Sequence, residues 1–338
     1  MILVLNCGSQ SIKWKLFDEK LELLKRDEID VFDSKKFEEK LKKGLLPLKN
    51  FDIDYVGHRV VHGGEYFREA KVITKKNIGK LEKLNKFAPL HNPFNILGIK
   101  VAQNIFKKAK QVAVFDTEFY SSLPEKAYTY TLPENLRKKG FRKFGFHGIS
   151  HEYVARKASK EEGFDFKKIK IISCHLGGGS SITAIKNGKA IDTSMGFTPL
   201  EGLTMMTRSG DIDPGIVLEI SKEYGYEKAK KILNLESGIK GISGISNMLI
   251  LLKKVKEGNK KAKLAFDIFV YKIQKYIGSY YVALGGCDLI VFTGSIGAGK
   301  SETRNAIVSG LPFPTNVKAI NPDEERAIAE KIIKLIKL

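Results

Sequence analysis

The sequence predicts a mixed α/β protein with two domains of similar core, and three observations support this. A buried-type strand at residues 2–5 is followed by a turn rich in glycine and serine at 6–11. The same unit, a strand and then a Gly/Ser turn, returns at residues 171–174 and 175–181. The chain has 338 residues, which is enough for two domains of ordinary size. The repeated unit therefore predicts an internal duplication.

Hydrophobic periodicity predicts the other elements of the first half. Residues 12–16 alternate between apolar and lysine side chains, which indicates a strand that returns from the first turn. Apolar residues recur at helical spacing in 78–86 and 95–108, so two helices are expected there. Residues 111–116 form an apolar run that ends in a carboxylate, which predicts a strand leading to a polar position.

The same patterns assign the second half. A returning strand at 182–185 precedes Asn187-Gly188, a pair typical of a tight hairpin turn. Residues 264–285 predict a long amphipathic helix, whose aromatic side chains are more typical of a core than of a cofactor site. The remaining expected elements are a strand at 288–293 and helices at 151–162 and 323–338.

The net charge is unusual for a globular chain. Lysine and arginine number 58 against 38 aspartates and glutamates, which gives a formal charge of +20. Much of the excess lies in mixed stretches such as 35–43 and 253–263, which are typical of solvated helix faces. Aromatic residues are not interleaved with the basic runs as on a base-stacking surface. A small anionic substrate is therefore favoured over nucleic acid.

Composition also favours a cytoplasmic protein without a membrane segment. The three cysteines are too few for a disulfide framework in a chain of this length. The longest apolar stretches, such as 248–252, are far shorter than the ~20 residues that cross a bilayer. No basic region precedes a long apolar run at the N-terminus, so a secretory signal is not expected.

The six histidines all lie between residues 58 and 175, in segments punctuated by glycine or proline. His58 and His62, like His147 and His151, are four residues apart, as two zinc ligands on one helix face would be. Neither pair has the glutamate of an HExxH motif, and nearby glycines argue against continuous helices. A zinc site therefore remains the weaker alternative.

Two features indicate that the chain binds an oxyanion. Arg59 and Arg208 stand near Gly, Ser or Thr, outside helical charge runs, where a planar fork of donors suits phosphate or carboxylate; a structural salt bridge is the alternative. Residues 294–301 fit GxxxxGK[ST] after a strand, but few residues follow, so the chain order is wrong for a P-loop fold. Phosphate or nucleotide contact by this glycine-rich loop remains the favoured interpretation.

An ordered set of motifs resembles the acetate kinase family over most of the chain. The first half contains LNCGSQSIKWKLF (5–17), VGHRVVHGGE (56–65), APLHNP (88–93), VAVFDTEF (112–119) and FGFHGISH (144–151). The second half contains HLGGGSS (175–181), DTSMGFTPLEGL (192–203), TRSGDIDPG (207–215), SGIKGISGIS (237–246), FTGSIG (292–297) and NPDEERAIA (321–329).

The resemblance implies a duplicated actin-like fold of the hexokinase and ribonuclease H type, with the active site in the cleft between two domains. The expected first domain comprises residues 1–145 with the C-terminal helix at 325–338, and the second, nucleotide-side domain comprises 146–324. The implied reaction is ATP + acetate ⇌ ADP + acetyl phosphate, with Mg²⁺ or Mn²⁺ as cofactor. A cytoplasmic homodimer is expected, with no nucleic acid or membrane as partner.

The resemblance also implies roles for individual residues. Arg59 and Arg208 would bind the carboxylate and the phosphoryl group in flight, and His147 would donate a hydrogen bond to that group. Asp116 would orient the acetate and metal-bound water. At the metal site, Asn6 would contact phosphate or order metal-bound water, and Glu324 would hold Mg²⁺ directly or through its water shell.

The remaining implied contacts form two groups. The substrate pocket would comprise Arg59, Val61, Leu90, His91, Phe146 and Pro199, a small apolar set that suits a methyl group. The nucleotide would contact Ser11, Lys13, His175, Leu176, Gly177, Gly178, Gly179, Asn247, Ser295, Ile296, Gly297, Ala298 and Gly299.

Departures from the family pattern gather on the nucleotide side. Gly178 replaces an asparagine, Gln10 replaces a serine, and the segment around Asn247 lacks the usual aspartate and arginine. These changes leave GTP or pyrophosphate open as alternative phosphoryl donors. Propionate and butyrate are the alternative acceptors, since one methylene is worth only ~1–3 kcal/mol. A non-catalytic sensor of the same fold is the alternative from another class.

Overall fold

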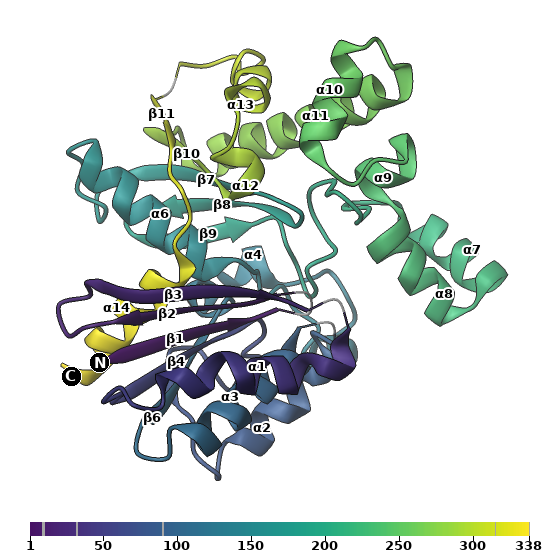
Figure 1. Ribbon diagram of the computed structural model, residues 1–338. Helices are drawn as coiled ribbons and strands as arrows, with labels where there is room; N and C mark the ends of the chain where they lie inside the picture. The colour runs from purple at the N-terminus through teal and green to yellow at the C-terminus, as the bar shows by residue number, and fades with distance from the viewer. Residues whose placement is uncertain (9–10, 32, 90, 315, 338) are drawn as a thin grey trace. The chain divides into compact units, whose positions relative to one another are not determined.

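The computed structural model describes residues 1–8, 11–31, 33–89, 91–314 and 316–337. It divides into two compact units (Figure 1). Unit 1 comprises Met1–Ser121, Phe146–Tyr153 and Asp323–Leu338, and unit 2 comprises Ser122–Gly145 and Val154–Pro322. The domain boundaries expected from the sequence remain a prediction. The compact units differ from them in that residues 122–145 belong to unit 2 and residues 146–153 to unit 1.

Unit 1 is built on a six-stranded sheet with the order β3-β2-β1-β4-β6-β5. Strand β1 pairs antiparallel with β2 and parallel with β4, and β4 pairs parallel with β6. The strands are β1 (Ile2–Cys7), β2 (Ser11–Phe17), β3 (Leu23–Asp30), β4 (Tyr55–Val60), β5 (Lys71–Val72) and β6 (Lys110–Phe115).

Helices cover both faces of this sheet, with α14 on one side and α1 and α3 on the other (Figure 1). Leu3 and Leu5 of β1 share a core with Phe37 of α1. On the opposite face, a Cβ at Gly57 of β4 would lie 2.6 Å from the side chain of Ile332, so α14 packs closely on the strand at this glycine. The helices of unit 1 are α1 (Phe37–Leu45), α2 (Ile78–Glu82), α3 (Asn92–Ile105) and α14 (Glu324–Ile336), with 3-10 turns at Ser34–Lys36, Leu46–Leu48, Lys83–Lys86 and Glu118–Tyr120.

A buried polar pair joins two parallel strands of unit 1. Nε2 of His58 on β4 lies 2.8 Å from Oε1 of Gln111 on β6, and the histidine is 1% exposed. Burial lowers the pKa of His58 to about 4, although the hydrogen bond to Gln111 opposes the shift. The histidine is therefore neutral in the folded chain at neutral pH, and its role is to link β4 to β6.

This histidine predicts a loss of stability in mild acid. The unfolded chain binds a proton at His58 below pH ~6.5, whereas the folded chain does so only near pH 4, so stability falls as pH is lowered between these values. We expect the contribution of His58 to fall by about 2 kcal/mol between pH 7 and pH 5. Urea unfolding followed by fluorescence of the single tryptophan, Trp14 in unit 1, measures it. The variant His58→Gln is the reference, and an equal pH dependence in both proteins would contradict the prediction.

Unit 2 repeats the strand arrangement of unit 1. Its five-stranded sheet has the order β11-β10-β7-β8-β9, in which β7 pairs antiparallel with β8 and parallel with β10. These pairings match β6-β4-β1-β2-β3, so the predicted duplication is confirmed at the level of topology. The strands are β7 (Lys170–Leu176), β8 (Ser180–Lys186), β9 (Lys189–Thr193), β10 (Leu289–Thr293) and β11 (Asn316–Ala319).

The long helix α11 packs on the sheet of unit 2. Its buried side chains Phe269, Ile273 and Ile277 share a core with Ile172 of β7 and Phe292 of β10. Helix α6 (Gly148–Glu161) begins in unit 1 and continues into unit 2. The other helices of unit 2 are α4 (Glu125–Tyr128), α5 (Glu134–Arg137), α7 (Pro214–Tyr224), α8 (Tyr226–Lys231), a π-helical turn at Ile232–Glu236, α9 (Gly238–Ser243), α10 (Met248–Lys256), α11 (Lys260–Leu284), α12 (Gly294–Gly297) and α13 (Ser301–Val308).

Helix boundaries correct two expectations. The helix expected at 95–108 is α3, which begins and ends three residues earlier because Pro93 starts its first turn and Phe106 leaves helical geometry. The helix expected at 78–86 is α-helical only to Glu82 and continues as a 3-10 turn. None of the helices that the structure describes is both long and apolar enough to cross a membrane.

Candidate functional site

Strand ends bring three of the predicted site residues together in unit 1. Asn6 lies near the end of β1, Arg59 near the end of β4, and Asp116 directly after β6. Because these three strands are parallel neighbours, their carboxyl ends meet at one edge of the sheet. Glu324 joins them from the first turn of α14.

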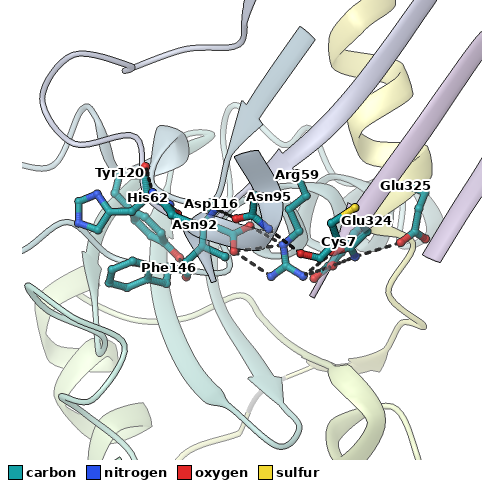
Figure 2. A network of polar contacts seen from close by, with 12 residues as sticks. Cys7, Arg59, His62, Asn92, Asn95, Asp116, Tyr120, Phe146, Glu324 and Glu325 are labelled. Atoms are coloured by element: carbon teal, nitrogen blue, oxygen red, sulfur yellow. Dashed lines mark hydrogen bonds and ion pairs between the residues drawn. The ribbon is translucent and has the colours of Figure 1, made fainter. Parts of the chain in front are cut away.

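Arg59 is the centre of this cluster (Figure 2). Its Nε and one terminal nitrogen donate to the carboxylate of Asp116, the shortest contact being 2.8 Å. The other terminal nitrogen lies 2.6 Å from Oε2 of Glu324. The guanidinium thus bridges two carboxylates that lie far apart in the sequence, and it binds Asp116 through two of its nitrogens, as arginine favours.

Asn6 extends the cluster toward α14. Its amide nitrogen donates to Glu324 at 3.0 Å and to Glu325 at 3.1 Å. Lys15 on β2 forms ion pairs with Glu325 and with Asp323, whose side chain caps α14. The first turn of α14 is therefore anchored at both glutamates, and its acidic side chains lie at the favourable end of the helix dipole.

Burial dominates the electrostatics of the cluster. Asp116 is 1% exposed, and burial raises its pKa while the Arg59 cation opposes part of the shift. Burial also disfavours the charged form of Arg59, but Asp116 and Glu324 outweigh it and raise the pKa of Arg59 further. The guanidinium of Arg59 therefore stays charged, and it fixes the position of both carboxylates.

His147 is placed beside this cluster by a strained turn. Its backbone φ is +58°, a conformation that non-glycine residues adopt mainly where the surrounding structure enforces it. The Tyr120 hydroxyl donates to the carbonyl of Phe146, and the amide of Gly148 donates to the carbonyl of Asp116 at 2.9 Å. Two hydrogen bonds therefore fix His147 relative to Asp116.

Gly148 makes this approach possible and predicts a sensitive position. A Cβ at Gly148 would lie 2.3 Å from the carbonyl oxygen of Asp116, so Gly148→Ala must push the two segments apart. We expect kcat to fall at least about tenfold, because catalytic groups displaced by even 1 Å lose much of their effect. Gly79→Ala on α2, where a Cβ meets nothing within 4 Å, is the matched control. Equal kcat in both variants would contradict the placement of His147.

The cluster contains the two residues for which a magnesium role is predicted, Asn6 and Glu324. Among the residues that the structure describes, no group of three or more His, Cys, Asp or Glu side chains could hold a metal ion. Magnesium, however, is usually bound by one or two carboxylates together with substrate phosphates. Both oxygens of Asp116 accept hydrogen bonds from Arg59, whereas only Oε2 of Glu324 makes the contacts to Arg59 and Asn6. The oxygen atoms of Asn6 and Glu324 are of the kind that Mg²⁺ prefers, and their metal role stays a prediction.

The residues predicted for the acyl pocket belong partly to unit 1 and partly to unit 2. Val61 and Phe146 are buried in unit 1, and His91 precedes α3 in the same unit. Pro199 belongs to unit 2. Leu90 lies outside the described residues, as does Gln10 of the first Gly/Ser turn.

Arg208 in unit 2 differs from Arg59 in its partners. Within the described part of the chain, its guanidinium donates to the carbonyl of Pro199 at 3.2 Å and lies 3.8 Å from the sulfur of Met205. Neither partner is charged, and burial lowers the pKa of Arg208. A partly buried cation whose described partners are both uncharged is costly, which suits a residue that receives an anionic ligand.

Two glycine-rich turns meet in unit 2. Thr293 of β10 pairs with His175 of β7, so the turn 175–179 and the turn 294–299 leave the sheet side by side. Gly294 has φ of +80°, and a Cβ there would lie 2.4 Å from the carbonyl oxygen of Leu176. The structure therefore brings together the two predicted phosphate loops His175–Gly179 and Ser295–Gly299.

Other predicted nucleotide contacts are occupied or lie elsewhere. Oδ1 of Asn247 accepts the amides of Leu249 and Ile250 as the N-cap of α10. Ser11 and Lys13 belong to unit 1, where Lys13 forms an ion pair with Glu28. Their nucleotide roles stay predictions.

Several supporting residues were not predicted from the sequence. Glu325 is 7% exposed and binds Asn6 and Lys15, and helical periodicity alone does not separate it from Glu324. Asn92 and Asn95 are buried at the start of α3. Their spacing of three at the start of this helix, among apolar residues, was a usable signal, because buried amides need specific partners.

Comparisons with known proteins agree over nearly the whole chain. A family profile described as the Acetokinase family matches residues 33–333. The acetate kinase of Clostridium novyi (strain NT) is 45% identical over 359 residues, covering 96% of this chain and 88% of that protein. The crystal structure of Porphyromonas gingivalis acetate kinase has a TM-score of 0.87 at 34% identity and covers 99% of both chains. A propionate kinase structure from Francisella tularensis subsp. tularensis SCHU S4 has a TM-score of 0.89 at 36% identity and covers 98% of both chains.

Proposed function

The chain belongs to the acetokinase family, and we propose that it transfers a phosphoryl group reversibly between ATP and acetate, giving ADP and acetyl phosphate. It is a phosphotransferase with a carboxyl group as acceptor, and its fold is the duplicated actin-like fold. The observation that carries the acetate assignment is 45% identity to acetate kinases over more than nine-tenths of the chain. The arginine-centred cluster in unit 1 supports the chemistry.

The reaction needs charge neutralisation more than a general base. A carboxylate with a pKa near 4–5 is already ionised at neutral pH and can attack phosphorus directly. The obstacle is repulsion between this anion and the phosphate chain. Positioned cations and hydrogen-bond donors remove that repulsion, which is the main source of catalysis in phosphoryl transfer.

The proposed roles follow from the environment of each group. Arg208, which has no carboxylate among the partners described above, receives an anionic oxygen of the substrate. Arg59 binds substrate while Asp116 and Glu324 hold its guanidinium in place. His147 donates a hydrogen bond to the transferring phosphoryl group. Mg²⁺ bound through Glu324 and Asn6 would neutralise charge on the phosphates.

A donor and acceptor panel tests the proposed function. Acyl phosphate is trapped as hydroxamate with acetate, propionate or butyrate as acceptor and ATP, GTP or pyrophosphate as donor. We expect the highest kcat/KM with acetate and ATP, and a lower value with propionate, since one methylene is worth ~1–3 kcal/mol. A rate with pyrophosphate and none with ATP would overturn the donor assignment, and folded protein without any rate would favour a sensor.

Propionate is the second candidate acceptor. The propionate kinase of Francisella tularensis shares 36% identity and a TM-score of 0.89 with this chain, comparable to the acetate kinase structures. The same panel decides between them: a higher kcat/KM with propionate than with acetate would make the chain a propionate kinase.

The proposal includes a cytoplasmic homodimer without nucleic acid or membrane partners, and a helix of unit 2 supports the dimer. Helix α7 has no buried residue, yet Ile216 is 49% and Leu218 69% exposed. The following α8 exposes Tyr226 as well. Exposed apolar side chains on two consecutive helices support an association surface in this part of unit 2.

We expect Leu218→Glu to convert the dimer into monomers at micromolar concentration. A charge placed in the centre of an apolar interface is desolvated without a partner on association. Size-exclusion chromatography with light scattering measures the mass. Leu24→Glu on β3, an exposed leucine of unit 1, is the control. A monomeric parent chain, or a Leu218→Glu variant that remains dimeric, would contradict the prediction.

A further inference from the structure

The segment that follows β4 is held by side chains in place of strand partners. The ladder between β4 and β6 ends where Val60 pairs with Phe115. The next two amides are bound by asparagines of α3: the amide of Val61 donates to Oδ1 of Asn95 at 3.1 Å, and that of His62 to Oδ1 of Asn92 at 3.0 Å.

The two residues after them follow the same pattern. The amide of Gly63 donates to the hydroxyl of Thr117 at 3.1 Å, and the amide of Gly64 donates to Nδ1 of His62. Every amide from residue 61 to residue 64 therefore donates to a side chain. A buried backbone amide needs a partner, and here side chains from α3 and from the segment after β6 supply it.

Both asparagines use their second polar atom as well. Nδ2 of Asn92 donates to the carbonyl of His62 at 3.1 Å, so this one amide binds both backbone groups of His62. Nδ2 of Asn95 donates to the carbonyl of Cys7 at the end of β1, at 2.7 Å. Asn92 is 0% and Asn95 3% exposed, so bulk water cannot replace the hydrogen bonds of either side-chain amide. Figure 2 shows both residues.

The segment carries one apolar side chain of the proposed acyl site, Val61, and contacts a second, Phe146. Val61 is two residues beyond Arg59 and is buried. The ring of His62 packs edge-on against Phe146, with centroids 5.4 Å apart. In the proposed function Val61 and Phe146 both line the acyl pocket. Fixing the backbone at 61–62 thus fixes one wall directly and supports the other.

We propose that Asn92, Asn95 and Thr117 are positioning residues that set carboxylate chain-length selectivity by holding the Val61–Gly64 backbone rigid. The proposal rests on the proposed function, in which Val61 contacts the acyl group. A pocket excludes a methylene only if its wall cannot retreat by a fraction of an ångström, because close-packed contacts penalise small overlaps. Without these hydrogen bonds the backbone at Val61 can move away from the acyl group. The kcat/KM for a larger carboxylate should then rise relative to that for acetate.

The test compares kcat/KM for propionate and acetate in two variants of different severity. Thr117→Val removes only the acceptor for the Gly63 amide and keeps the side-chain shape. Asn95→Ala removes both contacts to Val61 and Cys7. We expect the propionate-to-acetate ratio to rise about fivefold in Asn95→Ala and about twofold to threefold in Thr117→Val, a part of the roughly 10–200-fold that one methylene is worth.

The control has the same chemistry elsewhere in the chain. Thr183→Val in β8 of unit 2 removes a buried hydroxyl that is hydrogen-bonded to Thr193. It reproduces the loss of a threonine hydroxyl without touching the segment after β4. The propionate-to-acetate ratio of kcat/KM in Thr183→Val should equal that of the parent. A general loss of stability would instead change this ratio in all the variants alike.

The outcomes separate this proposal from the proposed function. A parent chain inactive on both carboxylates would refute the proposed function itself. An active parent, with an unchanged ratio in Thr117→Val and in Asn95→Ala, would overturn the positioning role. If Asn95→Ala does not fold, Thr117→Val decides alone, because a hydroxyl-to-methyl change preserves volume: a raised ratio supports the proposal and the parent ratio refutes it.

Discussion

Replacing Arg208 with methionine is expected to lower kcat about a thousandfold or more while leaving the chain folded and as stable as before. An arginine that neutralises the transferring phosphoryl group is typically worth about 10³–10⁵ in kcat. The stability expectation is as specific as the kinetic one. Arg208 contacts the carbonyl of Pro199 and the sulfur of Met205, and burial lowers its pKa, so its removal strands no carboxylate.

The rate of acetyl phosphate formation measures the expected loss of kcat, and thermal unfolding followed by circular dichroism measures the stability. Arg137→Met, at an exposed arginine of α5 in the same unit, is the matched control. A kcat within about tenfold of the parent would remove Arg208 from the reaction. A large loss of stability together with activity would instead indicate a structural role for the guanidinium.

Replacing Arg59 with methionine is expected to reduce both activity and stability. The change leaves the carboxylates of Asp116 and Glu324 without their cation, 1% and 14% exposed respectively. Removing one partner of a buried ion pair costs about 3–5 kcal/mol. We therefore expect a loss of this size in urea unfolding followed by Trp14 fluorescence, together with a loss of kcat comparable to that of Arg208→Met.

A double variant separates the two effects. In Arg59→Met with Asp116→Asn, the buried charge is also removed, so about half of the lost stability should return while activity stays absent. The stability values form a double-mutant cycle that measures the pair directly. Additive losses in this cycle would contradict the coupling between Arg59 and Asp116.

The sequence predicted the repeated core but not its exposed parts. Strands β1, β2, β7, β8 and β10 are buried or alternate clearly, so local pattern suffices to find them. Strand β3, LLKRDEID, is exposed at nearly every position and is a strand only because β2 pairs with it. Tertiary pairing of this kind overrides local preference and leaves no periodic signal.

The residues of the site also divide into those that the sequence predicted and those that depend on long-range packing. Arg59, Asp116 and Glu324 could be named because chemistry and resemblance single them out, and the structure brings both carboxylates within hydrogen-bonding distance of Arg59 in unit 1. The supports were harder to find. Asn95, which binds segments 34 and 88 residues away, depends on long-range packing that no local window contains.

Direct ³¹P NMR of the purified chain with acetate, ATP and Mg²⁺ tests the central claim most directly. The account predicts one acetyl phosphate for each ADP formed, because the carboxylate and not water attacks the transferring phosphoryl group. Release of inorganic phosphate with ADP and no acetyl phosphate, or no turnover of ATP at all by the folded protein, would contradict it.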